Sequence, residues 1–158
     1  MGRKGTLLAA AVVPAAALLL ALAGCGSGGR LTKPEYEQRL RQAGQELVRA
    51  RAQLSRSKPK DEFKKGVEAV QGALGKAADR LDGITPPVDA EPANARLVAA
   101  LRKLAKDWDE VKSAADESPD AALAKAQKVA RGQDSRNAFD AITEIQRRGY
   151  DVGQLGGR

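Results

Sequence analysis

Few side chains in this sequence have the chemistry of a catalytic or metal-binding centre. Histidine is absent, which excludes serine–histidine and cysteine–histidine nucleophiles and histidine-ligated zinc. A glycine-rich phosphate-binding loop is also absent from the sequence. Carboxylates at helical spacing do occur, such as Asp107 with Glu110, and pairs of this kind can bind a hard cation or transfer protons. On an exposed helix face they are usually solvated, so we expect no enzyme activity, no metal and no cofactor.

Cys25 is the one cysteine, so it cannot form a disulfide within the chain. It follows a segment with two distinct parts. Arg3 and Lys4 form a cationic start, and an uncharged run rich in Ala, Leu and Val extends from Thr6 to Ala23. This order is typical of an export signal, although the apolar run is also long enough for a membrane-spanning helix.

The sequence at the end of this run, Leu22-Ala23-Gly24-Cys25, resembles the lipobox of bacterial lipoproteins. The resemblance implies that diacylglycerol is attached to the Cys25 sulfur. It also implies that a peptidase recognises Leu22, Ala23 and Gly24 and cuts before Cys25. Residues 1–24 would then be a cleaved signal peptide, and the protein would be lipid-anchored on the extracytoplasmic face of the cell membrane. The alternative is an uncleaved signal anchor with an unmodified cysteine.

Residues 25–31 are expected to form a flexible linker, because Gly26-Ser27-Gly28-Gly29 has no preferred conformation. The linker is short, so the domain that follows should lie near the membrane. We expect Arg30 to lie close to anionic lipid headgroups.

Residues 32–148 have the pattern of an all-α domain. Alanine is abundant and β-branched residues are few, and the aromatic content of 3% predicts a narrow core. Apolar residues recur at alternating steps of four and three, as in helices that pack along a seam. The seams are Tyr36, Leu40, Ala43, Leu47, Ala50 and Leu54; Phe63, Val67, Val70, Leu74, Ala77 and Leu81; Leu97, Leu101, Leu104, Trp108, Val111 and Ala115; and Leu123, Ala126 and Ala130.

Start signals precede each of these helices. Thr32 and Glu35 have the spacing of a capping box, and prolines occupy favoured first-turn positions. A later stripe of Phe139, Ile142 and Ile145 is out of phase with the fourth seam, so we expect a break at residues 132–135. Residues 149–158 are rich in glycine and predict a flexible tail. The expected helix starts are Thr32, Pro59, a residue between Asp89 and Pro92, and Ser118.

These elements predict an antiparallel up-down bundle of three long helices plus a broken fourth, because short connections place consecutive helices side by side. A long coiled coil formed by oligomerisation is the alternative, and the oligomeric state stays open. Tyr36, Phe63 and Trp108 are expected in the core.

Two charged clusters lie at the end of this bundle far from the linker, in a chain of net charge +7. The basic cluster suits an anionic envelope polymer, a lipid or a protein partner. Alternatively, the two clusters neutralise each other. Nucleic acid is not expected as a partner, because no aromatics are interleaved for base stacking. The basic cluster is Arg49, Arg51, Arg56, Lys58, Lys60, Lys64 and Lys65; the acidic cluster is Asp107, Asp109, Glu110, Asp116, Glu117 and Asp120.

The alanine- and arginine-rich composition, together with the Leu22–Cys25 motif, loosely resembles small helical cell-envelope lipoproteins of high-GC Gram-positive bacteria. The sequence thus favours a non-enzymatic, membrane-tethered domain that binds a partner in the cell envelope. A structural or homo-oligomeric envelope protein is the first alternative. A carboxylate-based enzyme or a cation-binding protein is the remote one.

Overall fold

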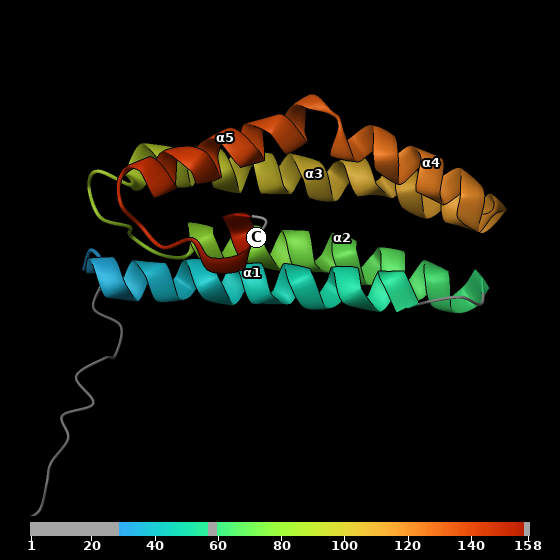
Figure 1. The fold of residues 1–158 in the computed structure, drawn as a ribbon, viewed down its shortest axis with the longest axis horizontal. Helices are drawn as coiled ribbons and strands as arrows, with labels where there is room; N and C mark the ends of the chain where they lie inside the picture. Colours follow the sequence, from blue (N-terminus) through green and yellow to red (C-terminus); the bar gives the residue numbers. More distant parts are fainter. Residues whose placement is uncertain (1–28, 57–59, 157–158) are drawn as a thin grey trace, which may run out of the picture.

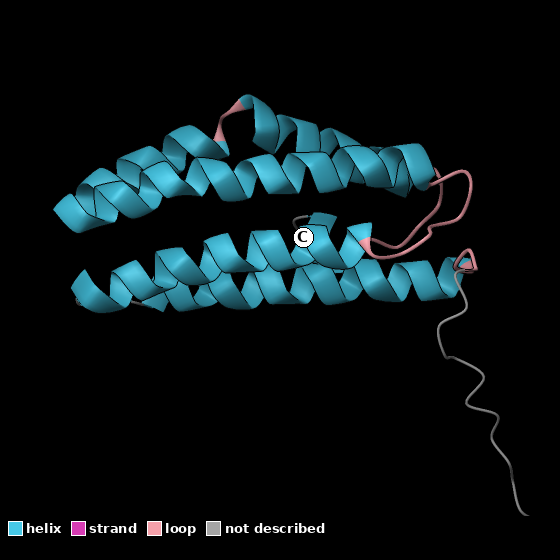
Figure 2. Cartoon of the chain, turned by 180° about the vertical axis from the view of Figure 1, so that it is seen from behind, coloured by secondary structure: helices cyan, strands magenta, loops and turns pink. Residues whose placement is uncertain are grey.

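The computed structural model describes residues 29–56 and 60–156, and the side chains of Lys60 and Asp61 are not among the described atoms. All regular secondary structure in this part of the chain is helical (Figure 2). The elements are α1 (Lys33–Arg56), α2 (Lys60–Asp82), α3 (Glu91–Glu117), α4 (Pro119–Ala130), α5 (Gln133–Arg147) and the 3₁₀ helix η1 (Gly153–Gly156).

The helices begin where the start signals predict. The backbone N–H of Thr32 donates to Glu35 Oε2 at 2.8 Å, which is the return half of a capping box at the start of α1. Ser118 Oγ accepts from the backbone N–H of Ala121 at 3.1 Å and caps α4, with Pro119 in the first turn. The expected break in the fourth helix is confirmed, because α4 ends at Ala130 and α5 begins at Gln133.

Helices that follow one another in sequence pack side by side: α1 against α2, α2 against α3, and α3 against both α4 and α5. Figure 1 shows α1 and α2 in one layer and α3, α4 and α5 in another, with the long axes roughly aligned. The start of α1, the end of α2, the start of α3 and the end of α5 lie at one end of the molecule, called here the proximal end. The end of α1, the start of α2 and the α3–α4 connection lie at the distal end.

The predicted seams supply most of the core. Among the largest fully buried side chains are Tyr36 and Leu40 of α1, Leu81 of α2, Leu97 of α3 and Ile145 of α5. A smaller distal cluster contains Val67, Val111, Ala115 and Ala122. Alanine at many core positions allows the helices to approach closely, which suits a narrow core with little room for an enclosed ligand.

The expectations for individual aromatic residues meet mixed outcomes. Tyr36 is fully buried, whereas Trp108 and Phe63 are only partly buried, with Trp108 packed against both apolar clusters. The predicted apolar stripe of Phe139, Ile142 and Ile145 is wrong at Phe139, whose side chain is 62% exposed. Helix α5 instead buries Ala138, Ala141, Ile142 and Ile145, which share one face of the helix.

The fourth seam is wrong at Leu123 and Ala130, which are exposed, whereas Ala126 packs against the distal cluster. Leu123 is 53% exposed, and Ala122 is the buried residue of α4. Alanine at this position brings α4 close to α3, and the leucine next to it is turned toward solvent. The sequence pattern cannot distinguish the two, because Leu123 and Ala122 both belong to an apolar run.

The C-terminal segment, residues 149–156, is not the flexible tail that its glycines predict. Tyr150 and Val152 are buried, and η1 contacts both α1 and α5. Tyr150 packs edge-on against Tyr36, with ring centroids 5.3 Å apart, and its hydroxyl donates to Asp89 Oδ1 at 2.6 Å. Gly149 and Gly153 have positive φ angles of 84° and 53°, so these glycines provide turns that fold the segment back across α1.

Candidate functional site

The residues of the Leu22–Cys25 motif lie outside the described residues, and so does Lys58 of the basic cluster. The backbone of Lys60 belongs to α2, but its side chain is not described. Within residues 29–56 and 60–156, no helix is both long enough and apolar enough to cross a membrane. The described members of the basic cluster lie at the distal end of α1 and α2.

Three members of the basic cluster line one groove between α1 and α2. Arg49 and Arg56 come from α1 and Lys65 from α2, around an open volume of about 530 Å³. We call this the basic groove; its lining residues are Arg49, Ala52, Gln53, Arg56, Glu62 and Lys65.

Helix geometry explains why these side chains converge. Arg49 and Arg56 are seven residues apart, which is two turns, so they share one face of α1. Ala52 lies between them on the same face and, being small, leaves the space that the longer side chains border. Glu62 and Lys65 are one turn apart on α2, which places them together on the opposite wall.

Three members of the acidic cluster, Asp109, Glu110 and Asp116, are bound by side chains of neighbouring helices. Lys64 donates to Asp116 at 2.5 Å, so one member of the basic cluster does pair with the acidic cluster. Lys125 Nζ lies 2.8 Å from Glu110 Oε2, and its hydrogen bond lowers the pKa of Glu110. Neutralisation between the clusters is thus confirmed at Lys64.

The other described cations of the basic cluster have no such partner. The side chains of Arg49, Arg51, Arg56 and Lys65 make no ion pair or hydrogen bond with another described residue. Among the five described side chains of the basic cluster, the structure therefore shows one paired and four unpaired. Three of the four line the basic groove, and Arg51 lies outside it.

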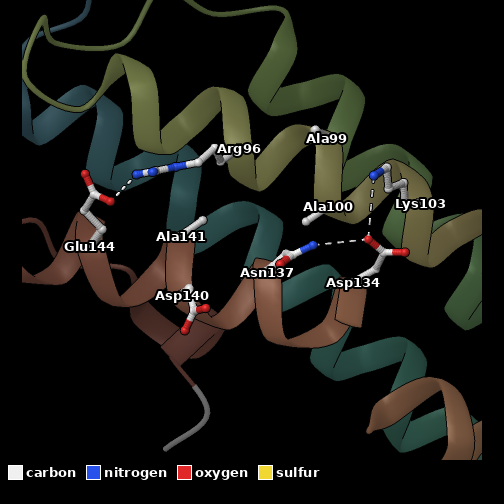
Figure 3. Close-up of a pocket in the computed structure, with 9 residues that line it drawn as sticks. All are labelled: Arg96, Ala99, Ala100, Lys103, Asp134, Asn137, Asp140, Ala141 and Glu144. Carbon is white, nitrogen blue, oxygen red and sulfur yellow. Dashed lines mark hydrogen bonds and ion pairs between the residues drawn. The ribbon is translucent and has the colours of Figure 1, made fainter. Parts of the chain in front are cut away.

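A second polar groove, between α3 and α5, has a different charge arrangement (Figure 3). Its α3 wall carries Arg96 and Lys103, and its α5 wall carries carboxylates. Arg96 forms an ion pair with Glu144, and Lys103 Nζ lies 3.9 Å from Asp134 Oδ1. These facing charges bind each other across the groove, and Asp140, which also lines it, has no ion pair with a described residue.

The carboxylate pair singled out in the sequence, Asp107 and Glu110, does not line this groove, although Asp107 is close enough to Asp134 for their charges to interact. Burial raises the pKa of Asp107, and the negative charges of Asp134 and Glu110 raise it further. No group of three or more cysteine or acidic side chains in the described part of the chain is arranged to hold a metal ion.

Sequence reasoning identified the cations of the site but missed its walls. Ala52, Gln53 and Glu62 line the basic groove without a motif of their own, although Ala52 could have been found from its position between Arg49 and Arg56. The chain matches no known protein family, no curated protein and no solved structure.

Proposed function

We propose that this chain is the precursor of a membrane-tethered extracytoplasmic lipoprotein. Its helical domain is a non-enzymatic module that binds an anionic partner of the cell envelope through the basic groove. The observation that carries the proposal is that three cations without an ion pair to a described residue line one groove.

The tether rests on the Leu22–Cys25 motif and the export signal before it. Two acyl chains on Cys25 would contribute about 0.8 kcal/mol for each buried methylene, enough for a stable anchor. Cys25→Ser is expected to abolish acylation and to leave an uncleaved precursor, whereas Ser27→Ala in the same linker should be processed normally. The mass of the N-terminal peptide measures both. Normal cleavage and membrane retention of Cys25→Ser would refute the tether.

The direction of α1 determines how far the basic groove lies from the linker. We infer an up-down bundle in which α1 starts at the linker and extends away from the membrane. Helix α1 has 24 residues, so at 1.5 Å per residue its end lies about 35 Å from its start. The basic groove is near that far end, where a partner in the envelope can reach it.

The chemistry of the groove favours phosphate or carboxylate groups. Arginine presents a planar fork of donors that matches both groups, and an unpaired arginine gives up no existing ion pair when it binds. Cations on both walls suit a partner that carries several negative charges. Since Glu62 is the acidic residue of the lining, the groove remains net positive.

A polyanion titration tests this site. Poly(glycerol phosphate) is titrated into the full acylated protein, and into a groove variant in which Arg49, Arg56 and Lys65 are all changed to Glu. The matched control changes Lys76, Lys106 and Lys128 to Glu; these exposed lysines lie outside the groove, and the change in net charge is the same. We expect the groove variant to lose at least about tenfold in affinity and the control to lose much less, because non-specific attraction follows net charge. Equal losses in the two variants would refute the groove as the site.

A further inference from the structure

The linker leaves the domain at the loop between α2 and α3, residues 83–90. The backbone N–H of Leu31 donates to Thr85 O at 2.8 Å. Arg30 Nη1 donates to Pro86 O at 2.6 Å and forms an ion pair with Glu91 at 2.7 Å. Arg30 is thus held against the α2–α3 loop by the domain itself. The end of the linker and the α2–α3 loop are therefore fastened together.

The remaining chain between this attachment and Cys25 is short. Leu31 comes six positions after Cys25, and a fully extended chain spans at most about 3.5 Å per residue, or about 20 Å in all. If Cys25 carries the lipid, the α2–α3 loop cannot lie farther than this from the bilayer surface.

The same loop carries Val88, which is 69% exposed and is the most exposed large apolar side chain among the described residues. An isolated exposed valine is unremarkable in itself. Here its loop is closed by backbone hydrogen bonds, since Pro87 O accepts from the backbone N–H groups of Ala90 and Glu91 at 2.9 and 3.1 Å. Val88 therefore lies in a hydrogen-bonded turn next to Pro86, which binds Arg30 of the linker.

The charges around the loop are compatible with a lipid surface. Asp89 accepts from the Tyr150 hydroxyl, and Glu91 is paired with Arg30, so both carboxylates next to Val88 are engaged. Lys33 and Arg147 are exposed near the start of α1 and the end of α5, and the exposed carboxylates Glu35 and Asp82 at the same end are bound by Thr32 and Arg102. The positive charge of Lys33 and Arg147 is attracted to anionic headgroups.

We infer that the α2–α3 loop is the surface on which the anchored domain rests against the phospholipid bilayer, with Val88 inserted at the interface. This inference rests on the proposed lipid anchor. It adds a second, protein-mediated contact that fixes the orientation of the bundle, with its proximal end on the membrane and the basic groove away from it.

Site-specific tryptophan quenching tests the contact. Trp108 is the one tryptophan in the sequence, so Trp108→Phe provides a silent background. Val88→Trp and, as the matched control, Leu123→Trp are made in this background in the full acylated chain. Leu123 is also an exposed large apolar residue, but it lies in the second turn of α4, near the distal end. Each protein is reconstituted into vesicles containing lipids with brominated acyl chains.

We expect Val88→Trp fluorescence to shift to the blue and to fall at least twofold relative to vesicles without bromine, with little change for Leu123→Trp. Equal quenching at the two positions, or none at position 88, overturns the inference. A blue shift at position 88 without quenching indicates contact with another protein copy and also overturns it. The mass of the N-terminal peptide separates the two levels: an acylated protein without quenching refutes only this contact, whereas an unacylated protein refutes the proposed anchor as well.

Discussion

At the residue scale, two residues of the same type can have different roles because different atoms surround them. Gly44 of α1 is buried under the C-terminal segment, and a Cβ atom there would lie 2.8 Å from the backbone nitrogen of Leu155. Gly72 of α2 faces open space, with nothing within 4 Å of a Cβ. In the sequence both appear only as helix-weakening glycines. The structure shows that the first allows the C-terminal segment to approach α1.

These two glycines give opposite predictions for alanine substitution. Gly72→Ala should raise the free energy of unfolding by up to about 1 kcal/mol, because alanine is the better helix former. Gly44→Ala should lower it by about 1–3 kcal/mol through overpacking against Leu155 backbone, which cannot move without releasing η1. Denaturant unfolding measures both, and hydrogen exchange at residues 150–156 should accelerate only in Gly44→Ala. Equal stabilisation by both substitutions would contradict the described packing of the C-terminal segment.

The two tyrosines, Tyr36 and Tyr150, give a prediction for alkaline pH. Burial raises the pKa of Tyr150 to about 12, assisted by its hydrogen bond to Asp89, and burial also raises the pKa of Tyr36. In the unfolded chain the pKa of a tyrosine is about 10. Above that pH the unfolded state has fewer bound protons than the folded state, so stability falls as the pH rises from about 10 toward 12.

Tyrosinate absorbance checks this directly, because these are the only two tyrosines in the sequence. In the folded protein the transition should begin well above the ordinary tyrosine range, and Tyr150→Phe should make the alkaline loss of stability less steep. A titration midpoint at about pH 10 with the helices intact would show that both tyrosine rings are solvated.

At the element scale, the sequence identifies helices better than their orientation. Starts and stops could be predicted because capping residues and prolines act locally, as at Thr32 and Ser118. The face that α4 buries could not be predicted, because Ala122 and Leu123 both satisfy an apolar pattern. Close packing against α3 selects the smaller residue, Ala122. The packing of the C-terminal segment against α1 could not be predicted for a related reason. Its glycines are typical of a tail, and the turns they form depend on a surface on α1 some hundred residues earlier.

The cap of α4 offers a local test of these elements. Ser118→Ala removes the acceptor for the Ala121 N–H and should cost about 1 kcal/mol of unfolding free energy. Ser113→Ala is the matched control, since Ser113 is exposed within α3 and its hydroxyl donates to Asp109 O, which is already in a helix. We expect the control to be neutral or slightly stabilising. If thermal or denaturant unfolding shows the reverse order, the cap does not stabilise α4.

At the scale of the whole molecule, the two ends have different surfaces. The proximal end joins the linker to the α2–α3 loop through Leu31 and Arg30, and the distal end holds the basic groove. Charge counting along the sequence could predict a basic cluster. It could not predict that Lys64 is paired with Asp116 while Arg49, Arg56 and Lys65 stay unpaired, because pairing depends on which helix faces surround each cation.

The central claim is that an anionic partner binds in the basic groove, and arginine-specific chemical modification tests it at single residues. The full acylated protein is treated with an arginine-modifying dicarbonyl reagent, with and without saturating poly(glycerol phosphate), and modified peptides are quantified by mass spectrometry. Arg39 and Arg131 are the internal controls, because they are exposed arginines outside the groove. We predict that the polyanion protects Arg49 and Arg56 several-fold and leaves Arg39 and Arg131 nearly unchanged. Uniform protection of all four arginines, or protection of none, would contradict the claim.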